Sequence, residues 1–282
     1  MYEEFFGLNE SPFSLTPDPR FLWLSETHQE GLAALIYGIT RHKGFLLLTG
    51  EVGTGKTTLL RAALSQIPPD TDTALVLNTV GITPIDLLKL IAAEFGLEGN
   101  FESTADYLIA LNRMLLERLR IGRNTVLIID EAQNLDSETL EEIRLLSNLE
   151  TDTAKLMQIV LTGQPELLKK LEAPGLRQLR QRIAVEHHME VLQPDEVKPY
   201  LSHRLGVAGG TYSDIFEPDC EPIFSWFSDG CPRLISLLAD RVLLAAFSRE
   251  IRPIGPDFVE KKAKSMGGNK MSGVFGELRR EN

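Results

Sequence analysis

The chain has 282 residues and a formal net charge of −11, with 43% hydrophobic and 24% charged residues. This composition is typical of a globular protein with a sizeable core, and the length suits about two domains. The acidic balance argues against a strongly basic nucleic-acid binder. No apolar run approaches the ~18 residues of a membrane helix, and the acidic N-terminus is no signal peptide, so cytoplasmic residence is the expectation.

The first two thirds of the chain predict a lead-in and then alternating strands and helices. Residues 1–25, rich in proline and aromatic residues, predict an extended segment with turns. Strands are expected at 45–49, 73–78, 125–130, 155–162 and 184–192, and helices at 26–40, from the glycine-rich loop to 66, and at 84–95, 104–121 and 137–149. Continuous apolar strands separated by helices predict an α/β fold, a three-layer αβα domain with a parallel sheet over residues 26–193.

From residue 194 onward the strand pattern stops. Helices are expected at 195–206, 218–228, 232–249 and 255–263. They predict a small all-α lid domain over residues 194–264. Residues 265–282 contain glycines and charges with little periodicity, which predicts a flexible tail.

The stretch GEVGTGKTTLL, residues 50–60, follows the first strand and matches G-x-x-x-x-G-K-[ST]. Glycines allow backbone N–H groups to surround phosphate oxygens, and the following helix directs its N-terminal dipole at the same anion. Lys56 is expected to reach the β- and γ-phosphates of ATP, and the Thr57 hydroxyl to bind Mg²⁺. An ordinary glycine-rich turn is the alternative, which the strand–loop–helix context disfavours. The residues expected to bind the nucleotide are Gly50, Glu51, Val52, Gly53, Thr54, Gly55, Lys56, Thr57 and Thr58.

The strand VLIIDE, residues 126–131, supplies the acidic half of such a site. Asp130 is expected to hold Mg²⁺, and Glu131 to act as general base toward the attacking water. Two acidic residues that merely end a strand are the alternative, which is disfavoured beside a phosphate loop about seventy residues upstream. When the glutamate directly follows the aspartate, an added strand is expected between the two motif strands, and the strand at 155–162 could provide it.

That strand leads into TGQPEL, where Thr162 or Gln164 is placed to hydrogen-bond the γ-phosphate or the attacking water. Gln164 is favoured, and a polar residue that opens a turn before Pro165 is the alternative.

Three arginines in GLRQLRQRI, residues 175–183, predict an arginine finger for a neighbouring subunit's γ-phosphate. Arg182 is the first choice, with Arg180 and Arg177 as alternates, and a solvated basic helix face is the competing interpretation. Because a finger needs a neighbour's nucleotide, we expect a homo-oligomer, a ring such as a hexamer.

Two further residues are candidates for the nucleotide site. Arg233 lies in the first turn of a predicted helix, where a cation is disfavoured by the helix dipole, and this position predicts an anion nearby. A surface arginine at modest cost is the alternative. His28 begins the helix before the phosphate loop and could lie near the base of the nucleotide, or be a plain helix-start histidine.

The phosphate loop, acidic pair, polar strand end, arginines and G-x-P-R lid together resemble an AAA+ ATPase over residues 26–264. Five segments are similar to the ExeA/GspA-type ATPases (general secretion pathway protein A) of bacterial secretion systems: MYEEFFGLNESPFSLTPDPRF, GEVGTGKTTLLR, IRLLSNLET, IVLTGQPEL and YLSHRLGVAGG.

This resemblance implies an ATP hydrolase that binds ATP and Mg²⁺ and acts as a motor at the inner membrane. An ATPase of this type helps to assemble an outer-membrane secretin through a membrane partner, and its relatives take part in pilus or other envelope biogenesis. The resemblance also implies that the segment from Phe13 to Phe21 packs near the adenine. Longer members carry a transmembrane helix and a peptidoglycan-binding domain, which these 282 residues lack. Peptidoglycan binding is therefore not expected of this chain, and whether it is a short member or a fragment stays open.

Two other interpretations remain open at the level of the sequence. DNA-binding transposition regulators of the TnsC type share the core, and a basic patch plus a basic tail would suit phosphate contacts. The net charge and the N-terminal signature count against this interpretation. The basic patch consists of Lys169, Lys170, Arg177, Arg180 and Arg182.

The second of these interpretations is a switch that binds nucleotide and hydrolyses little of it.

Overall fold

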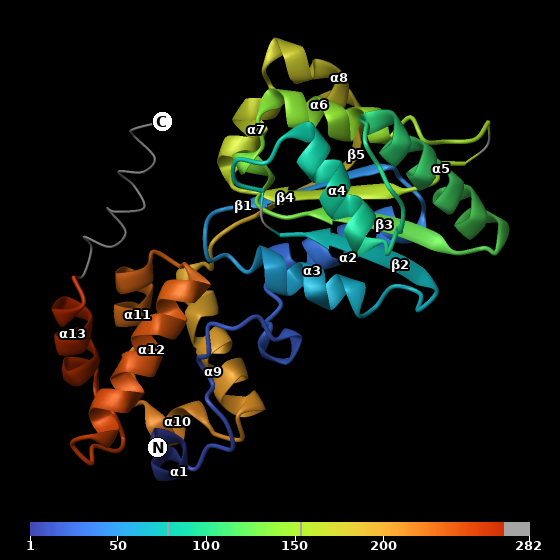
Figure 1. The fold of residues 1–282 in the computed structure, drawn as a ribbon. Helices are drawn as coiled ribbons and strands as arrows, with labels where there is room; N and C mark the ends of the chain where they lie inside the picture. Colours follow the sequence, from blue (N-terminus) through green and yellow to red (C-terminus); the bar gives the residue numbers. More distant parts are fainter. Residues whose placement is uncertain (78, 153, 268–282) are drawn as a thin grey trace. The chain divides into compact units, whose positions relative to one another are not determined.

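The computed structural model describes residues 1–77, 79–152 and 154–267, which form two compact units (Figure 1). The sheet unit contains residues 29–51 and 59–189. The helical unit contains residues 1–28, 52–58 and 190–267. The glycine-rich loop and the N-terminal segment are thus grouped with the C-terminal helices. The predicted flexible tail lies, from residue 268, outside the described residues.

The sheet unit is built on a five-stranded sheet in which every neighbouring pair is parallel, in the order β2-β3-β4-β1-β5. The strands are β1 (Phe45–Gly50), β2 (Thr71–Val76), β3 (Asn124–Ile129), β4 (Gln158–Gly163) and β5 (Ile183–Met189). The predicted α/β fold is confirmed. The expectation of a strand between the two motif strands is also confirmed, because β4 separates β1 from β3.

Successive side chains of the central strands point to opposite faces of the sheet, and each face packs against a layer of helices. This explains why these strands are apolar throughout. Leu47, Leu127 and Leu161 belong to one core, which the helices α4 to α8 cover. On the other face, α2 approaches β1 so closely that a Cβ at Gly38 would overlap the Leu46 side chain. The helices are α2 (Glu26–Thr40), α3 (Lys56–Leu64), α4 (Pro84–Glu94), α5 (Thr104–Arg120), α6 (Ser137–Leu146), α7 (Pro165–Leu171) and α8 (Arg177–Arg182).

The helical unit confirms the all-α prediction for the C-terminal part of the chain. Its helices are α9 (Val197–Val207), α10 (Tyr212–Ile215), α11 (Glu221–Ser228), α12 (Pro232–Phe247) and α13 (Pro256–Ser265). One buried hydrophobic cluster, rich in leucine, isoleucine and phenylalanine side chains, joins them.

The lead-in is not wholly extended, and that expectation was wrong at its first residues. Helix α1 (Tyr2–Phe6) forms there, followed by a 3₁₀ turn η1 (Pro19–Phe21). Gly7, with φ of 70°, ends α1 in the left-handed region, and its N–H bonds back to the helix carbonyls. Three further short helices, α7, α8 and α10, were not predicted from the sequence.

Residues 1–24, which we call the N-terminal strap, form part of the helical unit's core. Phe13 is 1% exposed and Phe21 6% exposed. Arg204 of α9 donates from Nε to the Pro12 carbonyl at 2.7 Å, and its guanidinium lies over both phenylalanine rings. At the other end of the strap, Tyr2 donates its hydroxyl to Asp240 of α12 at 2.6 Å. The strap is therefore structural for this unit, and its predicted proximity to adenine stays a prediction.

Replacing Phe13 by alanine is expected to destabilise the helical unit by about 3–4 kcal/mol, because it empties a fully buried position. The neighbouring Leu15 is 50% exposed, so Leu15→Ala should change stability by less than about 0.5 kcal/mol. Urea unfolding followed by circular dichroism measures both. Equal losses in the two variants would show that the strap is not packed as described.

Candidate functional site

The sheet brings the first residue of the glycine-rich motif and the acidic pair to one edge. Gly50 is the last residue of β1, Thr162 lies near the end of β4, and Asp130 directly follows β3. Because parallel strands share one direction, their carboxyl ends meet at the same edge of the sheet, where α/β proteins bind ligands. At this edge a single strand, β4, therefore separates the start of the glycine-rich loop from the acidic pair.

The glycine-rich loop is held against the first turn of α12 within the helical unit. Arg233 donates its backbone N–H to the Gly53 carbonyl at 3.2 Å. Gly53 has φ of 85°, and a Cβ there would lie 2.7 Å from Cβ of Arg233 and 2.9 Å from Sγ of Cys231. Burial raises the pKa of the Cys231 thiol, which keeps it a neutral donor toward the Val52 carbonyl at 3.5 Å. Only glycine fits position 53.

His28 reaches the same loop from the strap side, at a position that is 2% exposed. Its Nε2 lies 3.1 Å from the Thr54 carbonyl, and its Nδ1 lies 2.5 Å from the Ser25 hydroxyl. A carbonyl can only accept, so in the neutral ring Nε2 carries the proton and the Ser25 hydroxyl donates to Nδ1. His28 therefore contacts the backbone of the loop through one ring nitrogen.

The loop leads directly into α3, which begins at Lys56. Lys56 and Thr57 consequently lie in the first turn of a helix, the position expected of a phosphate loop. Lys56 is only 6% exposed, and a lysine so poorly hydrated is stable only with acceptor groups around it. Gly55, with φ of 100°, supplies the left-handed residue just before this helix.

Asp130 is 5% exposed and is oriented by its neighbours. Its Oδ1 accepts the Glu131 backbone N–H at 2.9 Å and also the Thr162 hydroxyl. Thr162 was one of two candidates for contacting a γ-phosphate or water, and here its hydroxyl is bonded to the carboxylate of Asp130. One Asp130 oxygen is thus fixed in place by the end of β4.

Glu131 adopts the left-handed conformation, with φ of 53° and ψ of 39°, which is rare for a residue other than glycine. Its Oε2 accepts two side-chain amides, from Gln133 at 2.5 Å and from Gln164 at 3.2 Å. The predicted Gln164 is thus bonded to the predicted general base. Gln133 was missed from the sequence. Its distance of two residues from Glu131, within the 3₁₀ turn η2 (Ala132–Asn134), is the only signal that could have pointed to it.

The three candidate finger arginines differ in their surroundings. Arg182 donates to the carbonyl of Arg144 at 3.3 Å and to the Ser147 hydroxyl, so it packs on the end of α6. Arg180 forms an ion pair with Glu186 at 2.6 Å. Arg177 is exposed, and its guanidinium forms no hydrogen bond or ion pair with another described residue.

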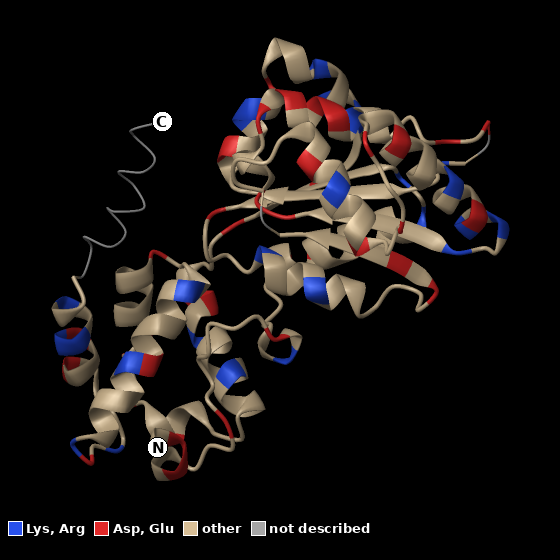
Figure 2. Ribbon diagram, viewed as in Figure 1, with Lys and Arg blue, Asp and Glu red and all other residues tan. Residues whose placement is uncertain are grey.

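The predicted basic patch is largely occupied by contacts within the sheet unit. Lys170 donates to the carbonyls of Gln133 and Leu135, at 2.7 and 2.6 Å, while Arg180 and Arg182 are bonded as described above. Figure 2 shows Lys and Arg interspersed with Asp and Glu along the helices. These contacts weaken the argument for the DNA-binding interpretation.

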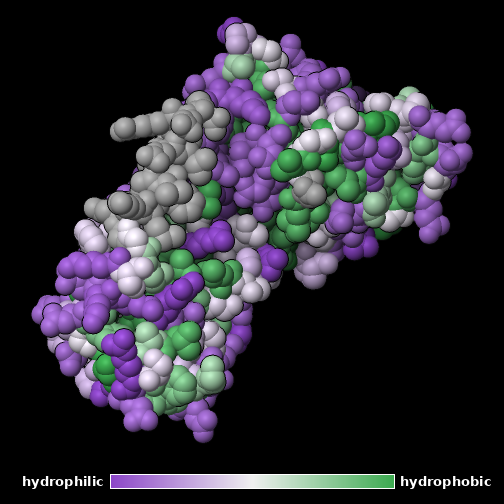
Figure 3. All heavy atoms as spheres, turned by 60° about the vertical axis from the view of Figure 1, so that its left-hand side comes forward, coloured by the Kyte–Doolittle hydropathy of each residue, from purple (hydrophilic) through white to green (hydrophobic). Residues whose placement is uncertain are grey.

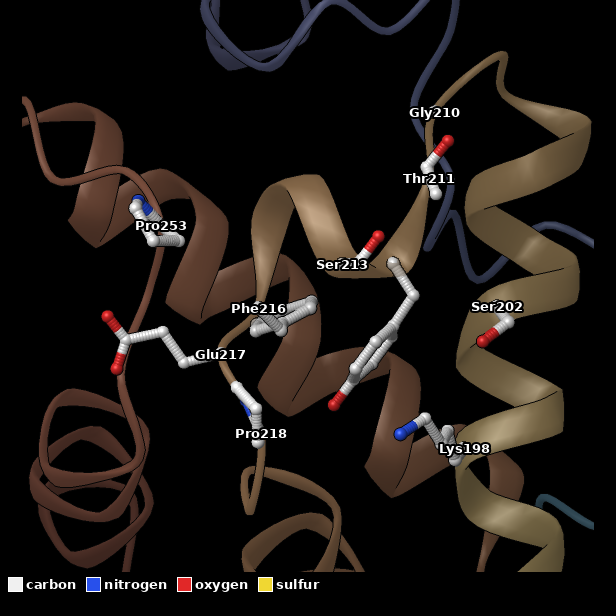
Figure 4. Close-up of a pocket in the computed structure, with 10 residues that line it drawn as sticks. Lys198, Ser202, Gly210, Thr211, Ser213, Phe216, Glu217, Pro218 and Pro253 are labelled. Carbon is white, nitrogen blue, oxygen red and sulfur yellow. The ribbon is translucent and has the colours of Figure 1, made fainter.

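A separate pocket of about 560 Å³ lies within the helical unit (Figure 4). Phe216, Pro218 and hydroxyl-bearing side chains line it, and Lys198 at its edge is paired with Glu221 at 2.7 Å. Its lining contains none of the residues predicted to bind nucleotide. Among the described residues, no cluster of three or more His, Cys, Asp or Glu side chains could hold a metal ion.

The surface carries apolar side chains between polar ones, as Figure 3 shows for one face. Val80, Ile109 and Ile121 are the most exposed of those in the sheet unit, at 71%, 68% and 71%. Within the described ranges, no helix combines the length and apolar character needed to cross a membrane.

Residues 39–171, which include the glycine-rich loop and the acidic pair, match the AAA domain family. Over these residues the chain is similar to AAA domains. It is 45% identical over 276 residues to general secretion pathway protein A of Aeromonas hydrophila, a match that covers 98% of this chain and 50% of that protein. The chain therefore spans about half the length of this curated relative. The similarity to this protein expected from the sequence motifs is confirmed.

Solved structures support the AAA+ fold of the chain. The ORC2 protein of Aeropyrum pernix, in its ADPNP-ADP complexes, matches with a TM-score of 0.70 and 18% identity, over 91% of this chain and 71% of that one. The Walker-type ATPase paby2304 of Pyrococcus abyssi matches with a TM-score of 0.62 and 19% identity, over 96% and 80%. The predicted P-loop AAA+ fold is confirmed.

Changing Gly53 to alanine is expected to destabilise the glycine-rich loop and to weaken binding of the nucleotide expected there. The left-handed φ alone costs about 1 kcal/mol for alanine, and the added Cβ would collide with Arg233 and Cys231. Thermal unfolding measures the loss of stability, and titration with a fluorescent nucleotide analogue measures the loss of affinity. Gly175→Ala is the matched control, because Gly175 lacks a positive φ and has open space around it. Wild-type behaviour of Gly53→Ala would contradict the close packing.

Proposed function

We propose that this chain is an ATP-hydrolysing AAA+ ATPase that works as a homo-oligomeric assembly motor in bacterial secretion, either type II secretion or a related pilus or envelope system. The observation that carries the hydrolytic part is Glu131, a carboxylate at the end of β3 that two amide groups hold beside Asp130. The similarity to general secretion pathway protein A supports the biological setting.

In this proposal the loop from Gly50 to Thr58 binds the phosphates of ATP through its backbone N–H groups, and Lys56 contacts the β- and γ-phosphates. The positive φ angles of Gly53 and Gly55 support it, because glycine lets the backbone turn so that N–H groups can face an anion. Thr57 and Asp130 would hold Mg²⁺, whose charge offsets that of the phosphates. The small exposed fraction and fixed Oδ1 of Asp130 suit a metal-binding carboxylate.

Glu131 acts as the general base and accepts a proton from the attacking water. Gln164 is proposed to act through Glu131, to which its side chain is bonded, and Arg233 to contact the phosphates from the first turn of α12. His28 is proposed to support the nucleotide by holding the Thr54 carbonyl, and so the loop.

The active form is proposed to be a ring in which an arginine of α8 contacts a neighbour's γ-phosphate. Its place of action would be the cytoplasmic side of the inner membrane, with a membrane protein of the secretion system as partner. The similarity to general secretion pathway protein A, of which the chain spans only half, supports this part of the proposal.

Two variants test the nucleotide chemistry. Lys56→Ala is expected to abolish nucleotide binding, because it removes the cation that faces the phosphates. Glu131→Gln is expected to retain binding and to lower turnover at least about 100-fold, since an amide cannot accept the water's proton. Equilibrium binding and steady-state phosphate release measure these effects. Wild-type turnover in Glu131→Gln would remove the general base from the proposal.

The finger is tested by comparing Arg182→Ala with Arg177→Ala. Arg182→Ala should retain ATP binding, lose the rise in specific activity with protein concentration, and lower the unfolding free energy by roughly 1 kcal/mol, because its contacts with α6 are lost. Arg177→Ala should leave stability unchanged. If Arg182→Ala keeps the concentration-dependent activity and Arg177→Ala loses it, the finger is Arg177.

A further inference from the structure

We infer that Gln133 is a positioning residue for the hydrolytic step, which holds Glu131 in place by bridging it to the turn between β4 and α7. The inference rests on the proposed function, because Gln133 would act through Glu131 in its role as general base. It assigns a task to a side chain that neither the phosphate loop nor the acidic motif includes.

Both ends of the Gln133 amide are used, and in a way that fixes its orientation. The Gln164 backbone N–H can only donate, and it lies 3.1 Å from Oε1 of Gln133. The nitrogen, Nε2, must then face the carboxylate of Glu131, whose Oε2 lies 2.5 Å away. A glutamine is therefore required here, because a glutamate could not donate and an apolar side chain could make neither bond.

The arrangement leaves one oxygen of the base for its chemistry. Gln133 and Gln164 both donate to Oε2 of Glu131. Among the described residues no hydrogen bond is recorded to Oε1, so this oxygen is the one that can accept a proton from water. Without the two amides the carboxylate could rotate about its side-chain bonds, and the backbone of Glu131 is already in a rarely adopted conformation.

Close packing holds the bridge itself in place. A Cβ at Gly163, the last residue of β4, would lie only 2.8 Å from Oε1 of Gln133, so the absence of a side chain makes room for the amide. On the backbone side, Lys170 of α7 donates to the carbonyls of Gln133 and Leu135. The turn η2 and the beginning of α7 are thus joined at both the side-chain and the main-chain level, and α7 leads through a short turn to the arginines of α8.

The test replaces Gln133 by methionine, which keeps the shape of the side chain and removes both hydrogen bonds. We expect kcat to fall about 10- to 100-fold, the size of one lost hydrogen bond to a charged group, while KM for ATP, nucleotide affinity and Tm stay near wild type. Gln133→Glu keeps the acceptor for Gln164 but places a second carboxylate against Glu131, and should lose at least as much activity. Gln66→Met, at an exposed glutamine of the chain, is the matched control.

A double-variant cycle decides whether Gln133 acts through Glu131. In single-turnover measurements, adding Gln133→Met to Glu131→Gln should lower the residual rate no further. The inference is overturned by wild-type kcat in Gln133→Met, by an equal further loss in the Glu131→Gln background, or by a joint fall of affinity and Tm in both Gln133 variants. If Glu131→Gln alone turns over normally, the proposed function fails, and this result is distinct from the others.

Discussion

The close approach between the glycine-rich loop and the first turn of α12 depends on the missing side chain of Gly53. A backbone carbonyl of the loop accepts the Arg233 N–H, one of the donors that the first turn of a helix leaves without an intrahelical partner. The loop thereby satisfies part of the helix end, and the helix end fixes part of the loop. Any ligand that reorganises the loop backbone must act on α12 as well, because the two share these bonds.

The acidic edge of the sheet is organised by a different kind of interaction. Asp130 and Glu131 are consecutive, and different side-chain donors hold each of them: Thr162 holds Asp130, and Gln133 and Gln164 hold Glu131. Donors to the charged form of a carboxylate stabilise it, which lets two adjacent acids remain close together at a poorly hydrated edge. Two of these donors come from the end of β4 and the turn that follows it. Strand order therefore matters for chemistry, since β4 must lie beside β3 for this arrangement to exist.

The sequence carried enough information for the strands, their parallel pairing, the central place of β4 and the phosphate-loop context, because each depends on local patterns. It did not reveal that Phe13 and Phe21 are core residues. They lie in a proline-rich segment without periodicity, and their burial comes from Arg204 and the helices far along the chain. Gln133 was missed for the same reason, since its partner Gln164 is brought near by strand pairing alone. Hydrogen bonds between segments that are distant in the sequence have no characteristic residue spacing, so they cannot be predicted from the sequence pattern.

The surroundings of Arg182 bear on how an oligomer could form a complete site. Its guanidinium is bonded to a neutral carbonyl and a neutral hydroxyl at the end of α6. Hydrogen bonds to a phosphate are charge-assisted and roughly twice as strong as those to neutral acceptors. An exchange of the α6 contacts for a neighbour's γ-phosphate would thus be favourable only while that phosphate is present. In such an arrangement the subunit contact would strengthen with ATP and weaken after hydrolysis, which is the behaviour an assembly motor requires of its interfaces.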